Sequence, residues 1–304
     1  MFNGNAAFCR TCWPSIRARL ALVALASIFA ISIRCSAQSI EPQDSSATSQ
    51  SQKSTRAAAA IRVPADRPER RGDANSQLAH EQLLEKARRG GIDVYFVGDS
   101  ITRRWGCSDP QYADLLANWQ SNFFGWNAAN FGWGGDTTQN ILWRLNHGEL
   151  DGVHPKVIVV LAGTNNLNAQ AIDDDSAEEI ARGIAAIVKA CREKAPAATI
   201  IVTAIFPRSD KPSLKPTINQ INDRLAMLAD QPRIRFLNVN AQLTNDHGEL
   251  LPGMLPDGLH PGVPGYQVWA DGLRPILSEL LGPPAKSDRA PPPTGDPSAQ
   301  PKTK

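Results

Sequence analysis

The stretch Val94-Tyr95-Phe96-Val97-Gly98-Asp99-Ser100-Ile101-Thr102 joins four consecutive apolar residues to a run of small and polar ones. An apolar run that is rich in β-formers and ends in a turn signal is typical of a strand buried on both faces. Ser100 then falls at the carboxyl edge of a sheet, where ligands of open α/β folds collect and a helix N-terminus can present a hydroxyl group. Ser100 is therefore a candidate nucleophile, although Asp-Ser after a strand is also an ordinary helix cap.

Strands and helices alternate along the chain around this stretch. Strands are expected at 93–98, 127–131, 156–162, 199–205 and 234–238. Helices are expected at 76–89, 110–122, 136–145, 175–194, 214–229 and 265–281, with Asp136 capping the third. This order predicts a parallel sheet that helices cover on both faces, with right-handed crossovers. The carboxyl ends of the strands then share one edge, where residues far apart in the sequence can meet.

The two ends of the chain differ in composition from this middle part. Basic residues precede the apolar stretch 20–33 and small residues follow it at 35–37, which predicts an export signal over 1–37 and a periplasmic or secreted protein. An uncleaved membrane anchor is the alternative, although the apolar stretch is short for a stable span. Few large apolar residues occur in 38–75 and 283–304, so a disordered linker and a disordered Pro-rich tail are expected there. The globular domain is expected over 76–282.

Charge and cysteine content exclude some classes of function. The 304 residues carry 32 Lys and Arg against 30 Asp and Glu, a net charge of +2, without a long basic stretch in the middle. No nucleic-acid partner is expected, because an extended nucleic-acid surface needs clustered cations. Cys107 and Cys191 alone lie beyond the expected export signal, and no spacing rule decides whether they pair. No metal-binding cluster is visible, and neither a metal nor another cofactor is expected.

Two further expected strand ends carry residues suited to binding a ligand. The segment 130–137 reads Asn-Phe-Gly-Trp-Gly-Gly-Asp-Thr, and its glycines let backbone N–H groups approach a ligand beside a helix N-terminus. This suits an oxyanion hole or a plain strand-to-helix turn, but not a dinucleotide site, because Thr137 replaces the third glycine. In the segment 163–166, Gly-Thr-Asn-Asn, the amide of Asn165 either braces a loop or donates to a ligand oxygen.

An acid and a base lie together in Asp257-Gly258-Leu259-His260, just before the last expected helix. A serine nucleophile needs a base to accept its proton and a carboxylate to hold the resulting imidazolium in the correct tautomer. Asp257 and His260 are close enough in a turn for the carboxylate to reach one ring nitrogen and leave the other free. The remaining histidines fit solvated positions better, and His80 and His147 are expected on helix surfaces.

Together these four segments resemble the SGNH hydrolases, also called the GDSL esterase/lipase family. Gly98-Asp99-Ser100, the glycines around Gly135, the segment 163–166 and the segment 257–260 correspond to its four blocks. Over 130–166 the sequence looks like a narrower group, the catalytic subunits of intracellular platelet-activating factor acetylhydrolase. The resemblance implies a flavodoxin-like three-layer α/β/α sandwich with a five-stranded parallel sheet. It also allows a homodimer, for which no interface stripe can be read in the sequence.

The resemblance further implies a role for each matching residue. Ser100 is the nucleophile and gives one backbone N–H to the oxyanion hole, Gly135 gives a second N–H, Asn165 gives its side-chain amide, His260 is the base, and Asp257 orients the base. Water would release the acyl group from an acyl-enzyme formed on the serine.

The expected function is an exported serine esterase that hydrolyses short-chain, mainly acetyl, carboxylic esters. Its substrate is expected to be a small-molecule ester or a polysaccharide-linked one. The alternatives are a lysophospholipase-like enzyme and a non-catalytic carbohydrate- or partner-binding domain on a hydrolase scaffold. Asp99 is expected to brace the turn by hydrogen bonds and not to act as the acid of the triad.

Overall fold

The structure is a computed structural model that describes residues 63–168 and 175–299. The expected export signal over 1–37 and the first part of the expected linker lie outside the described residues. Within the described ranges, no helix combines the length and the apolar character that crossing a membrane requires.

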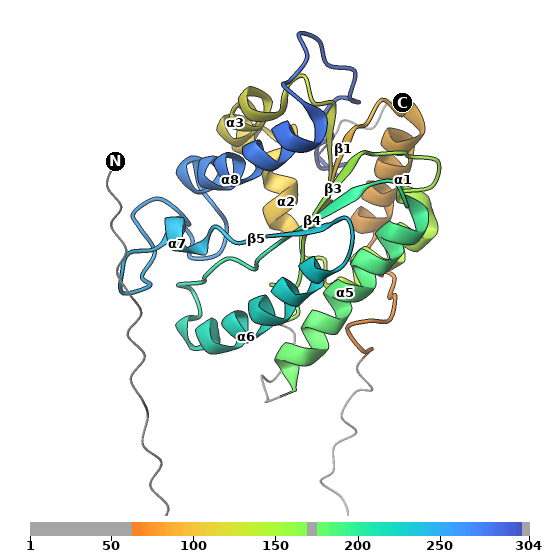
Figure 1. Cartoon of the computed structure of the whole chain (residues 1–304). Coiled ribbons are helices and arrows are strands. Elements are labelled where there is room, and N and C mark those ends of the chain that lie inside the picture. Colours follow the sequence, from red (N-terminus) through yellow and green to blue (C-terminus); the bar gives the residue numbers. More distant parts are fainter. Residues whose placement is uncertain (1–62, 169–174, 300–304) are drawn as a thin grey trace, which may run out of the picture. The chain divides into compact units, whose positions relative to one another are not determined.

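Five parallel strands form the sheet in the order β2-β1-β3-β4-β5, which confirms the predicted α/β class (Figure 1). The strands are β1 Val94–Gly98, β2 Ala128–Gly132, β3 Val157–Leu161, β4 Thr199–Thr203 and β5 Ile234–Leu237. Gly98 pairs with Gly132 on one side and with Leu161 on the other, so three adjacent strands end at the same level. The strand order reverses at β1, and the loops after these three strands leave the sheet side by side.

Helices follow each strand, largely where the sequence predicts them. They are α1 Ala74–Arg89, α2 Ser100–Trp105, α3 Ala113–Phe123, α4 Thr138–Arg144, α5 Ser176–Lys194, α6 Lys215–Ala226, α7 Asn240–Leu243 and α8 Val263–Leu281. Short helical turns are η1 Pro110–Tyr112, η2 Leu145–Glu149, η3 Pro212–Leu214 and η4 Met227–Asp230. The expected cap of the helix at 136–145 is wrong, because Thr137 and Asn140 form a capping box and the Asp136 carboxylate is engaged by Arg144.

Two hydrophobic cores enclose the sheet, one on each face. Tyr95 and its alternate neighbours pack against α1, α4, α5 and α6, whereas Phe96 and its alternate neighbours pack against α2, α3 and α8. This explains the unbroken apolar run of β1, since both sets of side chains are buried. On the second face Trp105 stacks on Trp269 with ring centroids 4.9 Å apart. Losing one such aromatic side chain costs about 3–5 kcal/mol, so Trp105 anchors the helix that begins at Ser100.

The described part of the expected linker is packed on the domain. The side chain of Gln139 donates to the Val63 carbonyl at 2.9 Å, and that of Asn140 donates to the Glu69 carbonyl at 3.0 Å. Helix α1 also begins two residues before the expected Ser76, with Asp73 as its N-cap. The expectation of disorder is therefore corrected for 63–75, where polar side chains of α4 bind backbone carbonyls and few apolar residues are needed.

The expected disordered tail is likewise corrected for residues 283–299, which we call the C-terminal strap. Its Asp288 carboxylate accepts from the backbone N–H of Gly125 at 2.8 Å, and its Arg289 N–H donates to the Asn127 side chain at 2.9 Å. Farther along, the Thr294 carbonyl accepts from the backbone N–H of Ser108 at 3.2 Å. These bonds join the strap to residues that are distant in the sequence, so the Pro-rich composition alone does not predict them. Residues 300–304 lie outside the described part.

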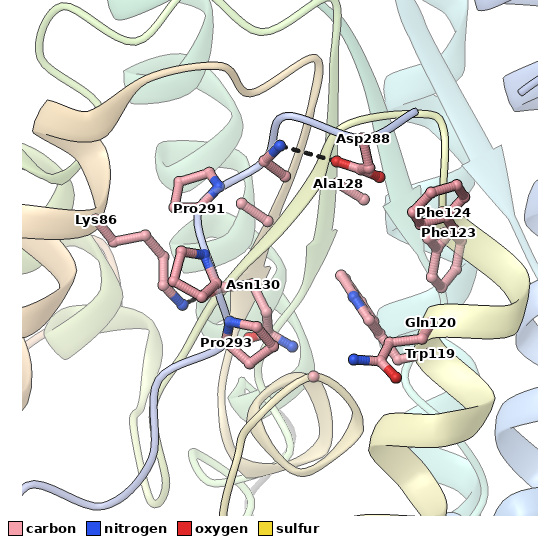
Figure 2. Close-up of a pocket in the computed structure, with 14 residues that line it drawn as sticks. Lys86, Trp119, Gln120, Phe123, Phe124, Ala128, Asn130, Asp288, Pro291 and Pro293 are labelled. Atoms are coloured by element: carbon pink, nitrogen blue, oxygen red, sulfur yellow. Dashed lines mark hydrogen bonds between the residues drawn. The ribbon is translucent and has the colours of Figure 1, made fainter. Parts of the chain in front are cut away.

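The strap also covers a buried ammonium group (Figure 2). The Lys86 Nζ donates to the Asn130 carbonyl and to the Thr294 hydroxyl, both at 2.9 Å. Figure 2 shows Pro291 and Pro293 of the strap beside this lysine, in the lining of a cavity of about 150 Å³. Burial lowers the pKa of Lys86 to about 7, although the Glu149 carboxylate opposes the shift.

Candidate active site

The turn after β1 is built for close approach of neighbouring backbone. A Cβ added at Gly98 would lie 2.2 Å from the Thr102 hydroxyl and 2.3 Å from the Leu161 carbonyl, so only glycine fits there. Asp99 caps α2 by accepting from the Ile101 N–H at 2.9 Å, and in this way it braces the turn as the sequence predicts. Burial raises the pKa of Asp99 to about 7 against the effect of that N–H. Ser100 is thereby fixed as the first residue of α2.

The structure brings Ser100 together with the acid and base turn of residues 257–260. The Ser100 Oγ lies 2.9 Å from His260 Nε2, and His260 Nδ1 lies 2.8 Å from Asp257 Oδ2. The other carboxylate oxygen of Asp257 accepts from the backbone N–H groups of Leu259 at 3.0 Å and His260 at 2.7 Å. The turn thus holds its own acid and base in one row with the serine.

The charges around this row favour a neutral base and an ionised acid. Burial lowers the pKa of His260, the hydrogen bond to Asp257 raises it, and the positive charges of Arg104 and Arg208 lower it again, with a lowered pKa as the net result. Partial burial raises the pKa of Asp257, but hydrogen bonds from the backbone and side chain of His260 hold it well below its usual range. A neutral imidazole can accept a proton from a hydroxyl group.

Gly135 and Asn165 lie on the loops that follow the two strands flanking β1. Gly135 is exposed and has φ of +79°, a left-handed conformation that favours glycine. The Asn165 side-chain amide donates to the Asp136 carbonyl at 2.9 Å, which joins the third loop to the glycine turn. An amide group has two N–H donors, so this bond orients Asn165 and leaves its second N–H for a ligand.

A buried arginine on α4 holds the ends of the first two strands together. Arg144 donates to the Asp136 carboxylate at 2.7 Å, to the Phe131 carbonyl at 3.0 Å and to the Gly98 carbonyl at 3.2 Å. Burial raises the pKa of Asp136 to about 6, although Arg144 opposes the shift. The sequence alone does not predict these contacts of Arg144 and Asp136, because the acceptors of Arg144 lie on two different strands and in the turn after β2.

The carboxylate of Glu149 joins the same buried network. It binds Arg144 through one oxygen and lies 2.8 Å from His80 Nδ1 through the other. The expected surface position of His80 is wrong, since only 6% of the residue is exposed. His147 is exposed, as the sequence predicts. The network lies behind the glycine turn and gives it a rigid support.

Two arginines beside the row of Ser100, His260 and Asp257 were not predicted from the sequence. Arg104 donates to Asp257 Oδ2 at 3.2 Å, and its position one helical turn after Ser100 is the signal that predicts a shared face. Arg208 is buried and donates to the Thr164 carbonyl at 3.2 Å. Its neighbour Ser209 donates a backbone N–H to the Gly258 carbonyl at 3.0 Å, for which no local sequence signal exists.

Cys107 and Cys191 are both free and buried, so they form no disulfide in this structure. Across 63–168 and 175–299, no group of three or more His, Cys, Asp or Glu side chains is arranged to hold a metal ion.

Comparison with known proteins places this geometry in a family. Residues 96–268, which include Ser100, Asp257 and His260, match the GDSL-like Lipase/Acylhydrolase family. The chain belongs to that family. This GDSL-family protein is 32% identical over 212 residues to the human platelet-activating factor acetylhydrolase IB subunit alpha1, covering 69% of this chain and 86% of the relative. It is 34% identical over 221 residues to the Gallus gallus subunit alpha2, covering 72% and 90%.

A solved structure agrees with the fold of this GDSL-family protein. A candidate acylhydrolase from Bacteroides fragilis superposes with a TM-score of 0.54 and 23% identity, covering 69% of this chain and all of the other. Family membership and the acetylhydrolase relatives together make this protein a carboxylic ester hydrolase.

Proposed function

We propose that this protein is a serine esterase that removes short acyl groups, mainly acetyl, through an acyl-enzyme. One observation carries the proposal: Ser100 Oγ lies 2.9 Å from the free nitrogen of an imidazole whose other nitrogen lies 2.8 Å from Asp257. Both distances are those of hydrogen bonds, so the serine has a base within reach and the base has its tautomer fixed.

The acylation step follows from this row. His260 takes the Ser100 proton while the oxygen attacks the ester carbonyl, and Asp257 stabilises the imidazolium that forms. The tetrahedral intermediate collapses as the ester C–O bond breaks, and His260 returns the proton to the departing alcohol. In the second half, His260 takes a proton from water while the water oxygen attacks the carbonyl of the acyl-enzyme. The second tetrahedral intermediate collapses as the bond to Ser100 Oγ breaks, His260 returns the proton to that oxygen, and the carboxylic acid leaves.

The negative oxygen of each tetrahedral intermediate needs donors that are already in place. We assign this role to the backbone N–H groups of Ser100 and Gly135 and to the side-chain amide of Asn165. The register of β1 with β2 and β3, which ends the three strands at one level, supports this assignment. So does the bond from Asn165 to the Asp136 carbonyl, because it holds the amide beside the glycine turn.

The preference for acetyl rests on the two relatives described above, both of which carry the name acetylhydrolase, at 32% and 34% identity. The alcohol part of the substrate is left to experiment, with acetylated polysaccharides and small acetyl esters as the first candidates.

The proposal that the protein is exported rests on the apolar stretch 20–33, which basic residues precede and small residues follow. N-terminal sequencing of protein recovered from the medium and periplasm of an expressing bacterium should show cleavage after residue 37. Recovery of only full-length protein in the cells would contradict the export proposal.

Labelling with a fluorophosphonate tests the nucleophile directly. The unaltered protein should form a covalent adduct at Ser100, whereas Ser100→Ala should remain unlabelled and inactive. The same two proteins should then be compared on acetylated xylan, simple acetyl esters and acyl-glycerophospholipids. Turnover of only the phospholipid would favour a lysophospholipase-like enzyme, and the absence of any adduct would favour a binding domain on a hydrolase scaffold.

A further inference from the structure

The acid of the catalytic row is unusually open to solvent for its role. The Asp257 side chain is 50% exposed, and it belongs to a turn, not to a strand or long helix. Water competes for an exposed carboxylate, and its side-chain rotation is restricted only by the groups that bind it. Asp257 can fix the tautomer of His260 and stabilise the imidazolium only if its carboxylate holds one orientation, so contacts from outside the turn become important.

The backbone of this turn is anchored by the segment after β4. The Gly258 carbonyl accepts from the backbone N–H of Ser209 at 3.0 Å, and Arg208 fixes that segment by donating to the Thr164 carbonyl. These bonds place the main chain of the turn. They do not touch Asp257 Oδ2, the oxygen that faces His260.

Arg104 makes that contact from the helix that carries the nucleophile. Its Nη1 donates to Asp257 Oδ2 at 3.2 Å, and the same oxygen lies 2.8 Å from His260 Nδ1. Arg104 follows Ser100 by four residues, so both side chains lie on one face of α2. Its guanidinium carbon lies 5.3 Å from the ring centroid of Tyr112, a cation–π distance that restricts the arginine.

We propose that Arg104 is a positioning residue that holds the acid of the triad at a fixed distance from the nucleophile. This inference rests on the proposed esterase function and deepens it. One short helix then presents the serine at its first turn and the clamp for the acid at its next turn. The contact between Arg104 and Asp257 thereby holds the exposed turn 257–260 in a fixed position relative to α2.

The charge of Arg104 has a second effect on the base. The charged groups that face His260 are Asp257 in its own turn, Arg104 from α2 and Arg208 from the segment after β4. Arg104 disfavours the imidazolium, which keeps His260 neutral and able to accept a proton at lower pH. Losing the arginine should therefore act on the orientation of the acid and on the titration of the base together.

Two substitutions separate these effects. Arg104→Met removes the charge and the donors but keeps most of the apolar stem, whereas Arg104→Lys keeps the charge without the planar fork. Arg235→Met is the matched control, because Arg235 forms an exposed ion pair with Glu279 at 3.3 Å on the last strand. For each protein we would measure kcat and KM on an acetyl ester against pH, the rate of fluorophosphonate labelling of Ser100, the titration of His260 by NMR and the melting temperature.

For Arg104→Met we expect kcat and the labelling rate to fall about tenfold, as for a small misplacement of catalytic groups. KM should change little, and the acidic midpoint of kcat/KM and the NMR titration of His260 should both move to higher pH. Arg104→Lys should restore the midpoint and part of kcat, and Arg235→Met should behave as the unaltered protein.

The proposal is overturned if Arg104→Met keeps kcat and the labelling rate within twofold of the unaltered protein. It is also overturned if activity falls with the melting temperature while the titration of His260 stays in place, since that would be a purely structural role. Failure of the proposed function looks different, because the unaltered protein itself would then show no adduct at Ser100.

Discussion

Replacement of Asp257 by Asn should hold His260 in the wrong tautomer, with its proton on Nε2 instead of Nδ1. The carboxylate has four partners: Oδ1 accepts from two backbone N–H groups, and Oδ2 faces His260 Nδ1 and Arg104. In Asp257→Asn the carbonyl oxygen must stay on the two backbone donors, because the opposite rotamer would point an NH₂ group at them. The NH₂ group then faces His260 Nδ1, so the imidazole keeps its proton on Nε2 and can no longer accept one from Ser100.

The expected loss follows from this change of tautomer. Loss of the correctly oriented base costs about 10⁴-fold in kcat, or about 5.5 kcal/mol of transition-state stabilisation. The cost to folding should stay below about 1 kcal/mol, because the replaced carboxylate is half exposed. Asp66→Asn is the control, since it breaks an exposed pair with Arg182 at 3.2 Å, the same distance as that between Arg104 and Asp257.

The assay is the steady-state rate on an acetyl ester, with melting curves of the three proteins run in parallel. A kcat for Asp257→Asn within tenfold of the unaltered protein, at an unchanged melting temperature, would refute the proposed role of Asp257 in orienting His260. It would mean that the 2.8 Å contact orients nothing that the reaction needs.

Other changes test separate parts of the structure. Asn165→Ala should reduce the stabilisation of the transition state by about 3 kcal/mol, the usual cost of one oxyanion donor, and so lower kcat by about 10²-fold. The circular dichroism spectrum should stay unchanged. Activity within tenfold of the unaltered protein would show that Asn165 is not part of the oxyanion hole. Activity should fall on acidification with a midpoint below pH 6.5, because burial lowers the pKa of His260 and protonation abolishes the base; a kcat/KM profile with a midpoint above 6.5 would contradict this. Between pH 7 and about 10.4 the unfolded chain binds a proton that folded Lys86 with its pKa of about 7 has released, so the free energy of unfolding should rise with pH more steeply than in Lys86→Met. The free energy of unfolding would be measured by urea titration at several pH values. An equal dependence of this free energy on pH in both proteins would show that Lys86 is not desolvated.

The sequence was informative where the structural signal is local. The run 157–161 of Val, Ile and Leu predicts a doubly buried strand by itself, and the observed β3 lies within the predicted 156–162. Ser100 and Asn165 could be predicted at one edge because the carboxyl ends of parallel strands must meet there. Arg104 and Asp257, by contrast, lie 153 residues apart, and no periodicity links them.

Polar contacts across the chain explain the remaining differences. A Pro-rich segment such as 283–299 has neither helical nor strand periodicity, so its place depends on donors and acceptors from other loops. The buried position of His80 has the same origin, because its partner Glu149 belongs to a turn that follows a different helix. Composition predicts whether a segment can form a hydrophobic core by itself. It does not predict whether hydrogen bonds from other loops hold a segment in place.

The strap has a consequence for how this polypeptide can be shortened. Its Asp296 carboxylate accepts from the Asn75 side chain at 3.0 Å, so the strap is bonded to the first turn of α1. A fragment cut to the family boundaries 96–268 would lose α1 with its buried Lys86, the first two residues of β1, much of α8 and the strap. Ser100, Asp257 and His260 would all be present in such a fragment, without the strap and α1 that pack beside the outer strand β2.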